Sequence, residues 1–241
     1  MFKMRSIIIL LSLAVILTVT GCSGILIGSG KVITETVQVS NFDRISLEGS
    51  GEVRVTQDGN ESLMVETYAN VMDLVIAEVE DGTLRLGLKE TDKMIWPRRL
   101  IFYVGVDDRT GLAVAGSGER EPESIQTDHL DAAVAGSGRI RVSNLTADGV
   151  KSSIGGSGEI DIAGGEAAEQ DVSISGSGKY VAGKVCGATV AVSISGSGDA
   201  TVCATESLDA DISGSGSVGY YGQPSVNVST SGSGSINSMD Q

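Results

Sequence analysis

The sequence has few of the residue types that catalytic sites and aromatic cores use. Its 241 residues include one histidine, one tryptophan, three prolines and three cysteines, and aromatic residues make up 4% of the chain. A Ser-His-Asp site would therefore rest on His129 alone, which follows Asp128 in a polar stretch, and we interpret it as a solvated turn residue. The few prolines leave strand backbone donors free to pair, and the scarcity of aromatics predicts an aliphatic core.

Basic residues are scarce as well. Lys and Arg total 17 against 31 Asp and Glu, a net charge of −14, and neither Lys nor Arg occurs from residue 185 to 241. Such a surface repels nucleic acid and anionic lipid, so we expect neither as a partner. The pairs Asp107-Asp108 and Asp209 with Asp211 lack the spacing of an EF-hand or of a calcium-binding nonapeptide repeat. We therefore expect no metal site and no cofactor.

Glycine, in contrast, is abundant, with 33 residues, and many of these belong to a repeated Gly-Ser-Gly tripeptide. Five copies stand 20 residues apart from Gly116 onward, two more follow at intervals of 18, and earlier copies begin at Gly28 and Gly49. A fixed period of this length indicates a repeat architecture. Glycine suits a tight turn because it adopts positive φ without a steric penalty. The glycines that we expect at structural turns are Gly116, Gly118, Gly136, Gly138, Gly156, Gly158, Gly176, Gly178, Gly196, Gly198, Gly214 and Gly216.

Apolar residues alternate with polar ones on both sides of each tripeptide, as in Val190, Val192 and Ile194 before one turn and Ile160 and Ile162 after another. This period predicts strands with one buried face. One such unit buries about five apolar side chains at ~2 kcal/mol each, whereas ordering its backbone costs ~1 to 2 kcal/mol per residue, so single units cannot fold alone. Stacked ~4.8 Å apart, they form an all-β fold, a parallel β-solenoid or β-helix with rungs of about 20 residues.

We assign residues 28–241 to one solenoid domain with two parts. Residues 116–241 are predicted to form regular Gly-Ser-Gly rungs, and residues 28–115 to form less regular ones. The first rung is expected from Gly28 to Gly49, and the 67 residues from Gly49 to Gly116 to form about three degenerate rungs, with or without a hairpin folded outwards. The alternative is a separate small β domain that caps the solenoid.

The N-terminus has the pattern of an export signal. Lys3 and Arg5 precede an apolar run over residues 7–19, which is too short to favour a membrane span, and we interpret residues 1–21 as a signal peptide. The end of this segment, Val-Thr-Gly-Cys22, resembles the bacterial lipobox, which implies acylation of Cys22 with fatty acids such as palmitate and a lipidated tether over residues 22–27. Ser23 after it implies sorting to the outer membrane. The alternative is an ordinary signal peptide with a chance cysteine.

Two cysteines remain after Cys22. Cys186 and Cys203 fall in adjacent repeats at similar but unequal offsets from the tripeptides. They either pair as a disulfide in an oxidising compartment or remain free, buried thiols, and the sequence leaves both alternatives open.

Several segments together resemble a known family. They are residues 28–32 (GSGKV), residues 42–53 (FDRISLEGSGEV), residues 79–84 (VEDGTL) and the Ser-Gly-Ser-Gly ladder that follows. In combination they resemble the bacterial head GIN domain family, over nearly the whole chain after Cys22. The resemblance implies a pectin-lyase-like β-helical fold and a role in adhesion, and it implies no catalytic residues.

From these observations we expect a non-enzymatic lipoprotein of the cell envelope that serves as a β-solenoid scaffold or adhesion module. The alternatives are a glycan-binding module and a polysaccharide lyase or hydrolase, the latter suggested by fold class alone. We expect the partner to be a glycan or a cell-surface protein. Two aromatic patches, residues 96–99 (WPRR) and Tyr220-Tyr221, are candidates for such contacts, although core packing and edge protection explain them as well.

The two ends of a solenoid carry unpaired strand groups, which must be capped or joined to another chain. We therefore expect the C-terminal end, beyond Ile236, to be closed by the last residues or by self-association into a homo-oligomer.

Overall fold

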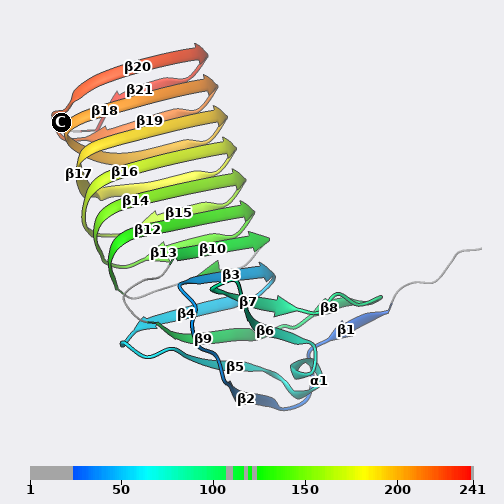
Figure 1. The fold of residues 1–241 in the computed structure, drawn as a ribbon. Coiled ribbons are helices and arrows are strands. Elements are labelled where there is room, and N and C mark those ends of the chain that lie inside the picture. Colours follow the sequence, from blue (N-terminus) through cyan, green and yellow to red (C-terminus); the bar gives the residue numbers. More distant parts are fainter. Residues whose placement is uncertain (1–23, 107–110, 117–118, 121–123, 240–241) are drawn as a thin grey trace, which may run out of the picture.

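The chain winds into a parallel β-solenoid of about six turns and is nearly all β (Figure 1). The computed structural model describes residues 24–106, 111–116, 119–120 and 124–239, with the backbone alone for residues 111–116 and 119–120. The predicted fold class is confirmed. The predicted signal peptide over residues 1–21, Cys22, Ser23, Gly118 and the pair Asp107-Asp108 lie outside the described residues. In the described part of the chain, we find no helix with the length and apolar character needed to span a membrane.

Each regular rung consists of a long strand, a Gly-Ser-Gly turn and a short strand. The long strands are β12 (Ile125–Gly136), β14 (Leu145–Gly156), β16 (Gly165–Gly176), the second parts of β17 (Lys179–Gly196) and β18 (Asp199–Gly214), and β20 (Ser225–Gly232). The short strands are β13 (Arg139–Val142), β15 (Glu159–Ile162), the first parts of β17 and β18, then β19 (Ser217–Tyr221) and β21 (Ser235–Ser238). Equivalent strands pair in parallel, so that Gly136, Gly156 and Gly176 are aligned.

The repeat shortens once, between β17 and β18. Up to Val181 and Thr201 paired residues are 20 positions apart, Cys186 and Cys203 pair at a distance of 17, and from Thr189 and Ser207 onward the distance is 18. The register shifts around the pair Cys186 and Cys203, which lie opposite each other. The change of period that is visible in the sequence therefore coincides with these two cysteines.

The N-terminal rung stacks on a rung far away in sequence. β3 (Arg44–Gly49) and β4 (Glu52–Gln57) pair in parallel with β10 (Gly111–Gly116) and β11 (Glu119–Arg120), and Gly49 is aligned with Gly116. The prediction of about three further rungs between these glycines is therefore wrong. Residues 58–106 instead fold back beneath β3 and β4, away from the regular rungs (Figure 1).

These residues form one more parallel level and then reverse. β7 (Thr83–Leu88) pairs in parallel with β3, and β9 (Leu100–Val106) with β4. Beyond them, β6 (Val75–Glu80), β5 (Ser62–Tyr68) and β2 (Val32–Val37) all run antiparallel to their neighbours. The two-residue turn at Asp81-Gly82 explains part of this, because a hairpin turn joins antiparallel strands and a solenoid coil cannot pass through it.

The rung predicted from Gly28 is also wrong. β2 follows Gly28 but pairs antiparallel with β5, and the single helical turn α1 (Ala69–Met72) follows β5. β1 (Ile25–Ile27) pairs with β8 (Met94–Trp96) in a two-stranded sheet of its own, apart from the main sheet. The antiparallel strands close the N-terminal end of the solenoid, and we call residues 28–106 without β3, β4 and β8 the cap.

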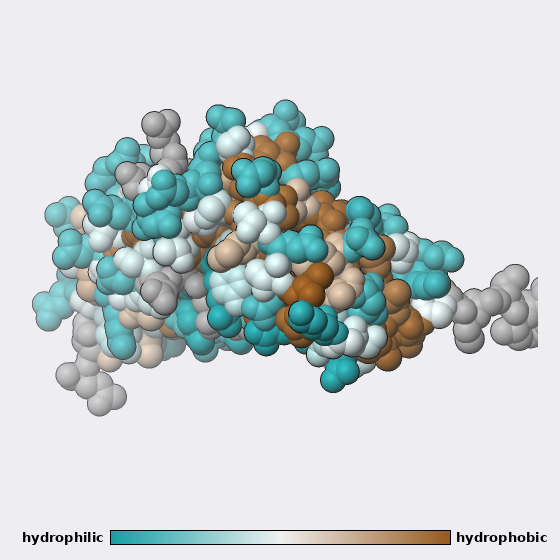
Figure 2. Space-filling view, turned by 90° about the horizontal axis from the view of Figure 1, so that it is seen from below, coloured by the Kyte–Doolittle hydropathy of each residue, from teal (hydrophilic) through white to brown (hydrophobic). Residues whose placement is uncertain are grey.

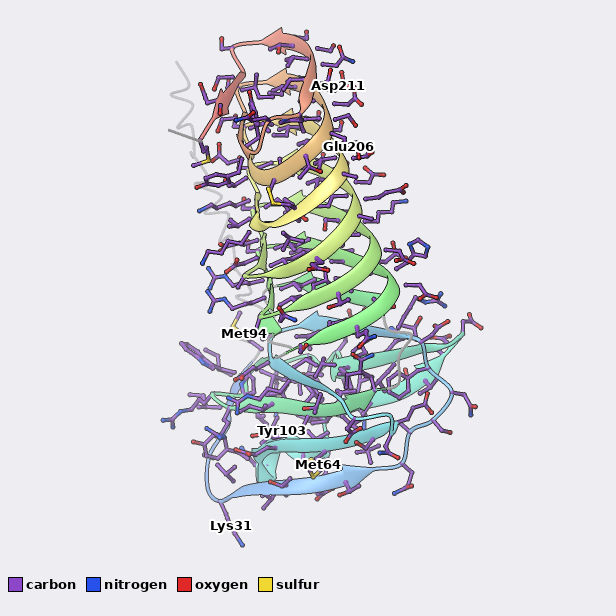
Figure 3. All side chains as sticks on the ribbon, turned by 90° about the vertical axis from the view of Figure 1, so that its left-hand side faces the viewer. Lys31, Met64, Met94, Tyr103, Glu206 and Asp211 are labelled. Atoms are coloured by element: carbon purple, nitrogen blue, oxygen red, sulfur yellow. A yellow bond between two sulfur atoms is a disulfide. The ribbon has the colours of Figure 1, made fainter. Side chains whose placement is uncertain are left out.

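One hydrophobic core runs the length of the molecule, from Phe42 in the cap to Val218 in the upper rungs. At the C-terminal end the same columns reach the surface, since Val226 and Val228 in β20 are 38% and 41% exposed. The last charged residue before Asp240 is Asp211, which projects with Glu206 from the upper solenoid, while Lys31 projects from the cap (Figure 3). The described C-terminal end is thus uncharged, with Val226 and Val228 exposed among serine, threonine and asparagine residues.

Candidate functional site

From Gly156 onward, both glycines of each Gly-Ser-Gly turn are required by the stacking of the rungs. At Gly156 φ is +116°, and a Cβ atom would lie 2.6 Å from the carbonyl oxygen of Gly136. At Gly158 a Cβ atom would lie 2.3 Å from Cγ1 of Val134. The amide of Ser157 also donates a hydrogen bond to the oxygen of Gly136, at 2.9 Å. A side chain at either glycine would therefore force neighbouring rungs apart.

The serine between the two glycines is not constrained in this way, yet it recurs in every turn. It is exposed, and a second exposed serine column stands two residues before it. We call these two columns the serine edge; they consist of Ser137, Ser157, Ser177, Ser197, Ser215 and Ser233, and of Ser175, Ser195, Ser213 and Ser231.

The hydroxyls of the serine edge are available to a partner. Among the described residues, no hydrogen bond joins one of these side-chain hydroxyls to another protein group. Because the rungs repeat at about 4.8 Å, each column presents a hydroxyl about every 4.8 Å. Each hydroxyl can donate one hydrogen bond and accept two. The serine edge is therefore a regular, uncharged array of donors and acceptors.

The short strands next to this edge carry charges that pair along the stack. Arg139 and Glu159 are 2.8 Å apart, and Arg141 and Asp161 are 3.3 Å apart. Exposed pairs of this kind contribute at most about 1 kcal/mol each. Their chief effect is to place opposite charges on neighbouring rungs, where like charges at the same spacing would repel one another.

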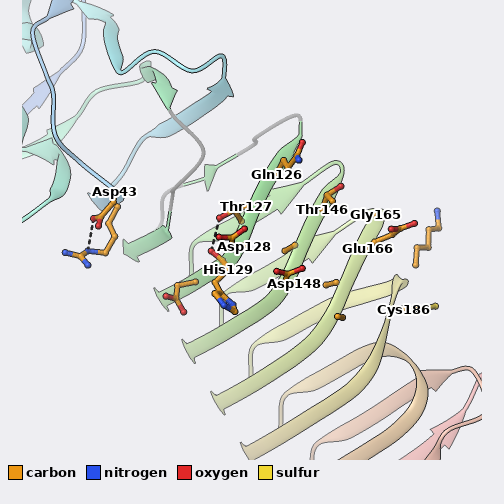
Figure 4. Close-up of a pocket in the computed structure, with 16 residues that line it drawn as sticks. Asp43, Gln126, Thr127, Asp128, His129, Thr146, Asp148, Gly165, Glu166 and Cys186 are labelled. Atoms are coloured by element: carbon orange, nitrogen blue, oxygen red, sulfur yellow. Dashed lines mark hydrogen bonds and ion pairs between the residues drawn. The ribbon is translucent and has the colours of Figure 1, made fainter.

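A polar groove crosses the first residues of the long strands, at the end of those strands away from the turns (Figure 4). It has a volume of about 1260 Å³ and extends from the loop before β3 to β17. Its charged and imidazole side chains are Asp43, Arg44, Asp128, His129, Asp131, Asp148, Glu166 and Lys184. Among the described residues, no three His, Cys, Asp or Glu side chains are placed to hold one metal ion.

His129 lies in this groove and is exposed. Its ring packs over the neighbouring rung, because a Cβ atom at Gly149 would lie 2.7 Å from its Nδ1. Its backbone oxygen accepts a hydrogen bond from the Thr127 hydroxyl at 3.1 Å. The surrounding acids, Asp128 and Asp148, mark breaks in the pairing of the long strands. Where we predicted a turn residue, the structure places a strand residue that is held by contact with glycine.

The basic and aromatic patch at residues 96–99 is divided by the fold. The guanidinium of Arg99 pairs with Glu66 on β5, and the Tyr103 hydroxyl donates to the same carboxylate at 3.1 Å. The Arg99 hydrogen bond, with a smaller contribution from Tyr103, lowers the pKa of Glu66. Arg98 lies 6.0 Å from the ring centre of Tyr68. Trp96, in contrast, is 63% exposed.

The second aromatic patch, Tyr220-Tyr221, lies mainly in packing contacts. Tyr220 packs against the core, and a Cβ atom at Gly183 would lie 2.8 Å from the ring of Tyr221. Both side chains are half-buried. The structure thus shows Tyr221 lying along the solenoid wall beside Gly183.

Cys186 and Cys203 form a disulfide between adjacent rungs, with their Cα atoms 4.4 Å apart. The sequence alone did not distinguish a disulfide from free thiols. The two cysteines are register partners, but they stand at unequal distances from the preceding turns, so the spacing did not predict their pairing.

The sequence pattern also missed a polar group inside the core. Tyr180 is fully buried, and its hydroxyl donates to Oε1 of Gln170 at 3.2 Å, while Nε2 of Gln170 donates to the oxygen of Val185 at 2.7 Å. Burial raises the pKa of Tyr180. The signal was present in the alternation, since Gln170 occupies the inward position held by Val150 and Val190 in the neighbouring rungs.

A comparison with models of known families gives the same family that the sequence resembles. The family model described as "Putative auto-transporter adhesin, head GIN domain" matches residues 41–224, well over half of the chain. The chain belongs to the head GIN domain family. No curated protein matches this head GIN chain at a significant level.

Solved structures share the fold of this head GIN protein. A "putative adhesin" from Bacteroides fragilis is 27% identical, with a TM-score of 0.81, over 89% of this chain and 100% of its own. A "putative lipid binding protein" from Parabacteroides distasonis is also 27% identical, with a TM-score of 0.74, over 90% of this chain and 100% of its own. A "putative adhesin" from Parabacteroides merdae, 22% identical with a TM-score of 0.72 over 90% and 100% of the two chains, shows the shared fold.

Proposed function

We propose that this head GIN protein is a non-enzymatic adhesion module of the cell envelope, anchored to the outer membrane by lipid at Cys22, and that its serine edge binds the partner. The observation that carries the proposal is the difference between the turn residues. Stacking requires both glycines, whereas it places no comparable demand on the exposed serine, which nevertheless recurs in each turn. A contact with a repeating partner accounts for that recurrence.

The chemistry of the serine edge suits a polymer of repeating hydroxyl and amide groups, such as a glycan. Unpaired hydroxyls in register can each exchange hydrogen bonds with such groups, and many weak contacts on one chain add up through effective concentration. The edge carries no charge of its own, so the acidic surface elsewhere does not prevent a neutral glycan from approaching. A β-rich cell-surface protein is the other partner that this edge fits.

Three further observations support the location. The basic start, the apolar run over residues 7–19 and Cys22 have the order of a lipoprotein signal. The C-terminal end of the solenoid lies opposite the cap, so a chain anchored near residue 22 presents its regular rungs away from the anchor (Figure 1). Two similar structures carry the name adhesin and one the name lipid binding protein, which supports contact of such proteins with surfaces.

The test measures retention on immobilised pectin, chitin, peptidoglycan and mucin glycans. Replacement of Ser177, Ser197 and Ser215 together by alanine should reduce retention on the bound glycan at least about tenfold, or ~1.4 kcal/mol. A matched control replaces three exposed serines off the edge by alanine, namely Ser143, Ser225 and Ser238. Equal retention of the two triple variants contradicts a role for the serine edge.

The location is tested separately with intact cells. Protease added outside should remove the solenoid if the protein faces the medium, and lipid extraction with mass spectrometry should find acyl chains on Cys22. An unmodified Cys22 in the mature protein contradicts the anchor.

The polar groove favours a second candidate, the processing of a polysaccharide. Asp128, Asp148 and Glu166 bring carboxylates to one groove, and paired carboxylates are the groups that glycosidases use. The same glycan panel tests this candidate by assay for new reducing or unsaturated ends. Turnover that is lost on Asp128→Asn would replace adhesion by catalysis as the function.

A further inference from the structure

The most apolar exposed feature of the described chain is the small sheet of β1 and β8. The two strands pair in parallel, with Ile25 opposite Met94 and Ile27 opposite Trp96. Since residues in register with the same parity share a face, these four side chains lie together on one face. They are 59%, 67%, 50% and 63% exposed, respectively. We call β1 and β8 the apolar ribbon.

The apolar ribbon projects sideways from the cap end of the molecule, at the opposite end from the C-terminus (Figure 1). A view from below shows hydrophobic surface gathered toward that side (Figure 2). A soluble protein rarely leaves four large apolar side chains side by side in water, and such a patch generally marks a site of interaction.

Hydrogen bonds fix the ribbon to the cap. The amide of Gly28 donates to the oxygen of Trp96 at 2.9 Å, and Nδ2 of Asn70 donates to the oxygen of Ile27 at 3.0 Å. The amide of Ser29 donates to Oδ1 of the same Asn70 at 2.9 Å. At Gly28 a Cβ atom would lie 2.1 Å from the oxygen of Pro97, so the two strands leave the cap in close contact. The apolar face therefore has a defined orientation.

The charge around the ribbon differs from that of the whole chain. Residues 89–99 hold four basic and two acidic side chains, and one of the basic ones, Arg99, pairs with Glu66. Three basic against two acidic side chains remain, a small local excess of positive charge on a protein whose net charge is −14. Lys93 and Arg98 flank β8 and are both exposed. Aromatic and aliphatic side chains bordered by basic ones are typical of a surface that lies in a bilayer interface.

Chain length then connects the ribbon to the proposed anchor. Three residue steps separate Cys22 from Ile25, which spans at most about 11 Å in any conformation. The polar headgroup layer of one leaflet is about 5 to 7 Å thick. If Cys22 carries lipid, Ile25 cannot leave the neighbourhood of the membrane surface, and the exposed face of the ribbon starts there.

We infer that the apolar ribbon docks into the headgroup region of the membrane that holds the Cys22 lipid, with Ile25, Ile27, Met94 and Trp96 buried in the interface and the basic side chains at the phosphates. The inference rests on the proposed lipid anchor. Docking at a second point beside the anchor stops the chain from swivelling freely on a single tether. The cap then sits on the membrane, and the regular rungs, with the serine edge, are held in one orientation.

Trp96 is the only tryptophan, so its fluorescence reports on the ribbon without interference. The acylated full-length mature protein is reconstituted into vesicles of phosphatidylethanolamine and phosphatidylglycerol. We expect the Trp96 emission to shift to shorter wavelength, and lipids brominated near the headgroup to quench it more strongly than lipids brominated at the chain ends. The Cys22→Ser protein, added to the same vesicles, should still partition, with lower affinity.

The variant I25S/I27S/M94S keeps the fluorophore and removes three of the four apolar side chains. It should abolish the emission shift of the acylated protein, and in the Cys22→Ser background it should weaken vesicle partitioning at least about tenfold. Met64→Ser, a matched change of an exposed methionine on β5, should leave both unchanged. Unchanged circular dichroism and thermal unfolding show that each variant is folded.

The outcomes separate the ribbon from the anchor. Acylated protein whose Trp96 emission and quenching do not change in vesicles overturns docking while the anchor stands. An unmodified Cys22 with a Trp96 shift that depends on the ribbon overturns the anchor while membrane docking stands. A Trp96 shift that depends on protein concentration without vesicles, together with dimers in light scattering, shows that a second copy covers the ribbon and overturns membrane docking.

Discussion

Replacement of Gly176 by alanine is the most direct test of how the rungs stack. Gly176 begins the turn of a central rung with φ at +123°, a region that costs an alanine about 1 to 3 kcal/mol. The added Cβ atom would also lie 2.4 Å from the oxygen of Gly156 and 3.2 Å from its carbonyl carbon. Relief of that overlap requires a backbone shift, and overpacking of this kind costs about 1 to 3 kcal/mol.

The two contributions predict a loss of about 2 to 6 kcal/mol in the free energy of unfolding. Urea denaturation followed by far-UV circular dichroism measures it, with Ser177→Ala, one residue away, as the matched control that should change stability by less than about 0.5 kcal/mol. The stability of a solenoid is a sum over rungs and over the interfaces between neighbouring rungs. Because the glycine variant weakens one such interface, the rungs on its two sides should unfold in separate transitions. If Gly176→Ala lowers the free energy of unfolding by less than about 1 kcal/mol, the stacking of the rungs does not require glycine in the turns.

Three further predictions concern the interior and the cap. Reduction of the Cys186–Cys203 disulfide should lower the free energy of unfolding by about 3 kcal/mol, the chain-entropy value for a loop of similar length, as measured by urea denaturation with and without dithiothreitol. Tyr180→Phe should cost about 1 kcal/mol in the same assay, because it removes one buried hydrogen bond and leaves its acceptor without that donor. Arg99→Ala should make the thermal midpoint less sensitive to acid: the pKa of Glu66 is lowered from its ordinary 4.5, so the pair stabilises the fold above that pH and loses its contribution as pH falls below it.

Each of these predictions has a result that contradicts it. Identical denaturation curves with and without reductant would mean that the bridge adds nothing to rung stacking. An unchanged free energy of unfolding for Tyr180→Phe would mean that the hydrogen bond to Gln170 is no stronger than the hydrogen bond to water that it replaces. Parallel acid profiles for wild type and Arg99→Ala, measured from pH 7 to below 4, would show that Arg99 does not set the charge of Glu66. Ser62→Ala, at the start of the strand that carries Glu66, is a control expected to leave the acid profile unchanged.

A large part of the solenoid could be predicted from residues that are local to each rung. Alternation of Val, Ile and Ala indicated the buried faces, and the 20-residue spacing of the glycines indicated the register, since Gly136, Gly156 and Gly176 align as that spacing requires. Local signals suffice here because every contact of a regular rung is with its equivalent one period away. The same regularity made the family resemblance recognisable.

The N-terminal third did not follow from its spacing. The 67 residues between Gly49 and Gly116 have nearly the length of three rungs, yet the two glycines are direct neighbours in the stack. Alternation is the same in a strand that pairs parallel and in one that pairs antiparallel, so the pattern of β5 or β6 could not reveal its direction. The pairing of β5 with both β2 and β9 joins segments up to about 40 residues apart, and the alternation of a single strand does not specify such partners.

The sequence by itself determined the repeat: where the turns fall, which faces are apolar, and that glycine must occupy the turns, because these follow from chain geometry within one period. Only the tertiary structure decided the rest. It brought Cys186 and Cys203 into register across unequal offsets, buried Tyr180 against Gln170, and paired β1 with β8, residues almost 70 positions apart, so that Ile25 and Trp96 share one exposed face. Contacts between segments so distant depend on packing in three dimensions, which no local period encodes.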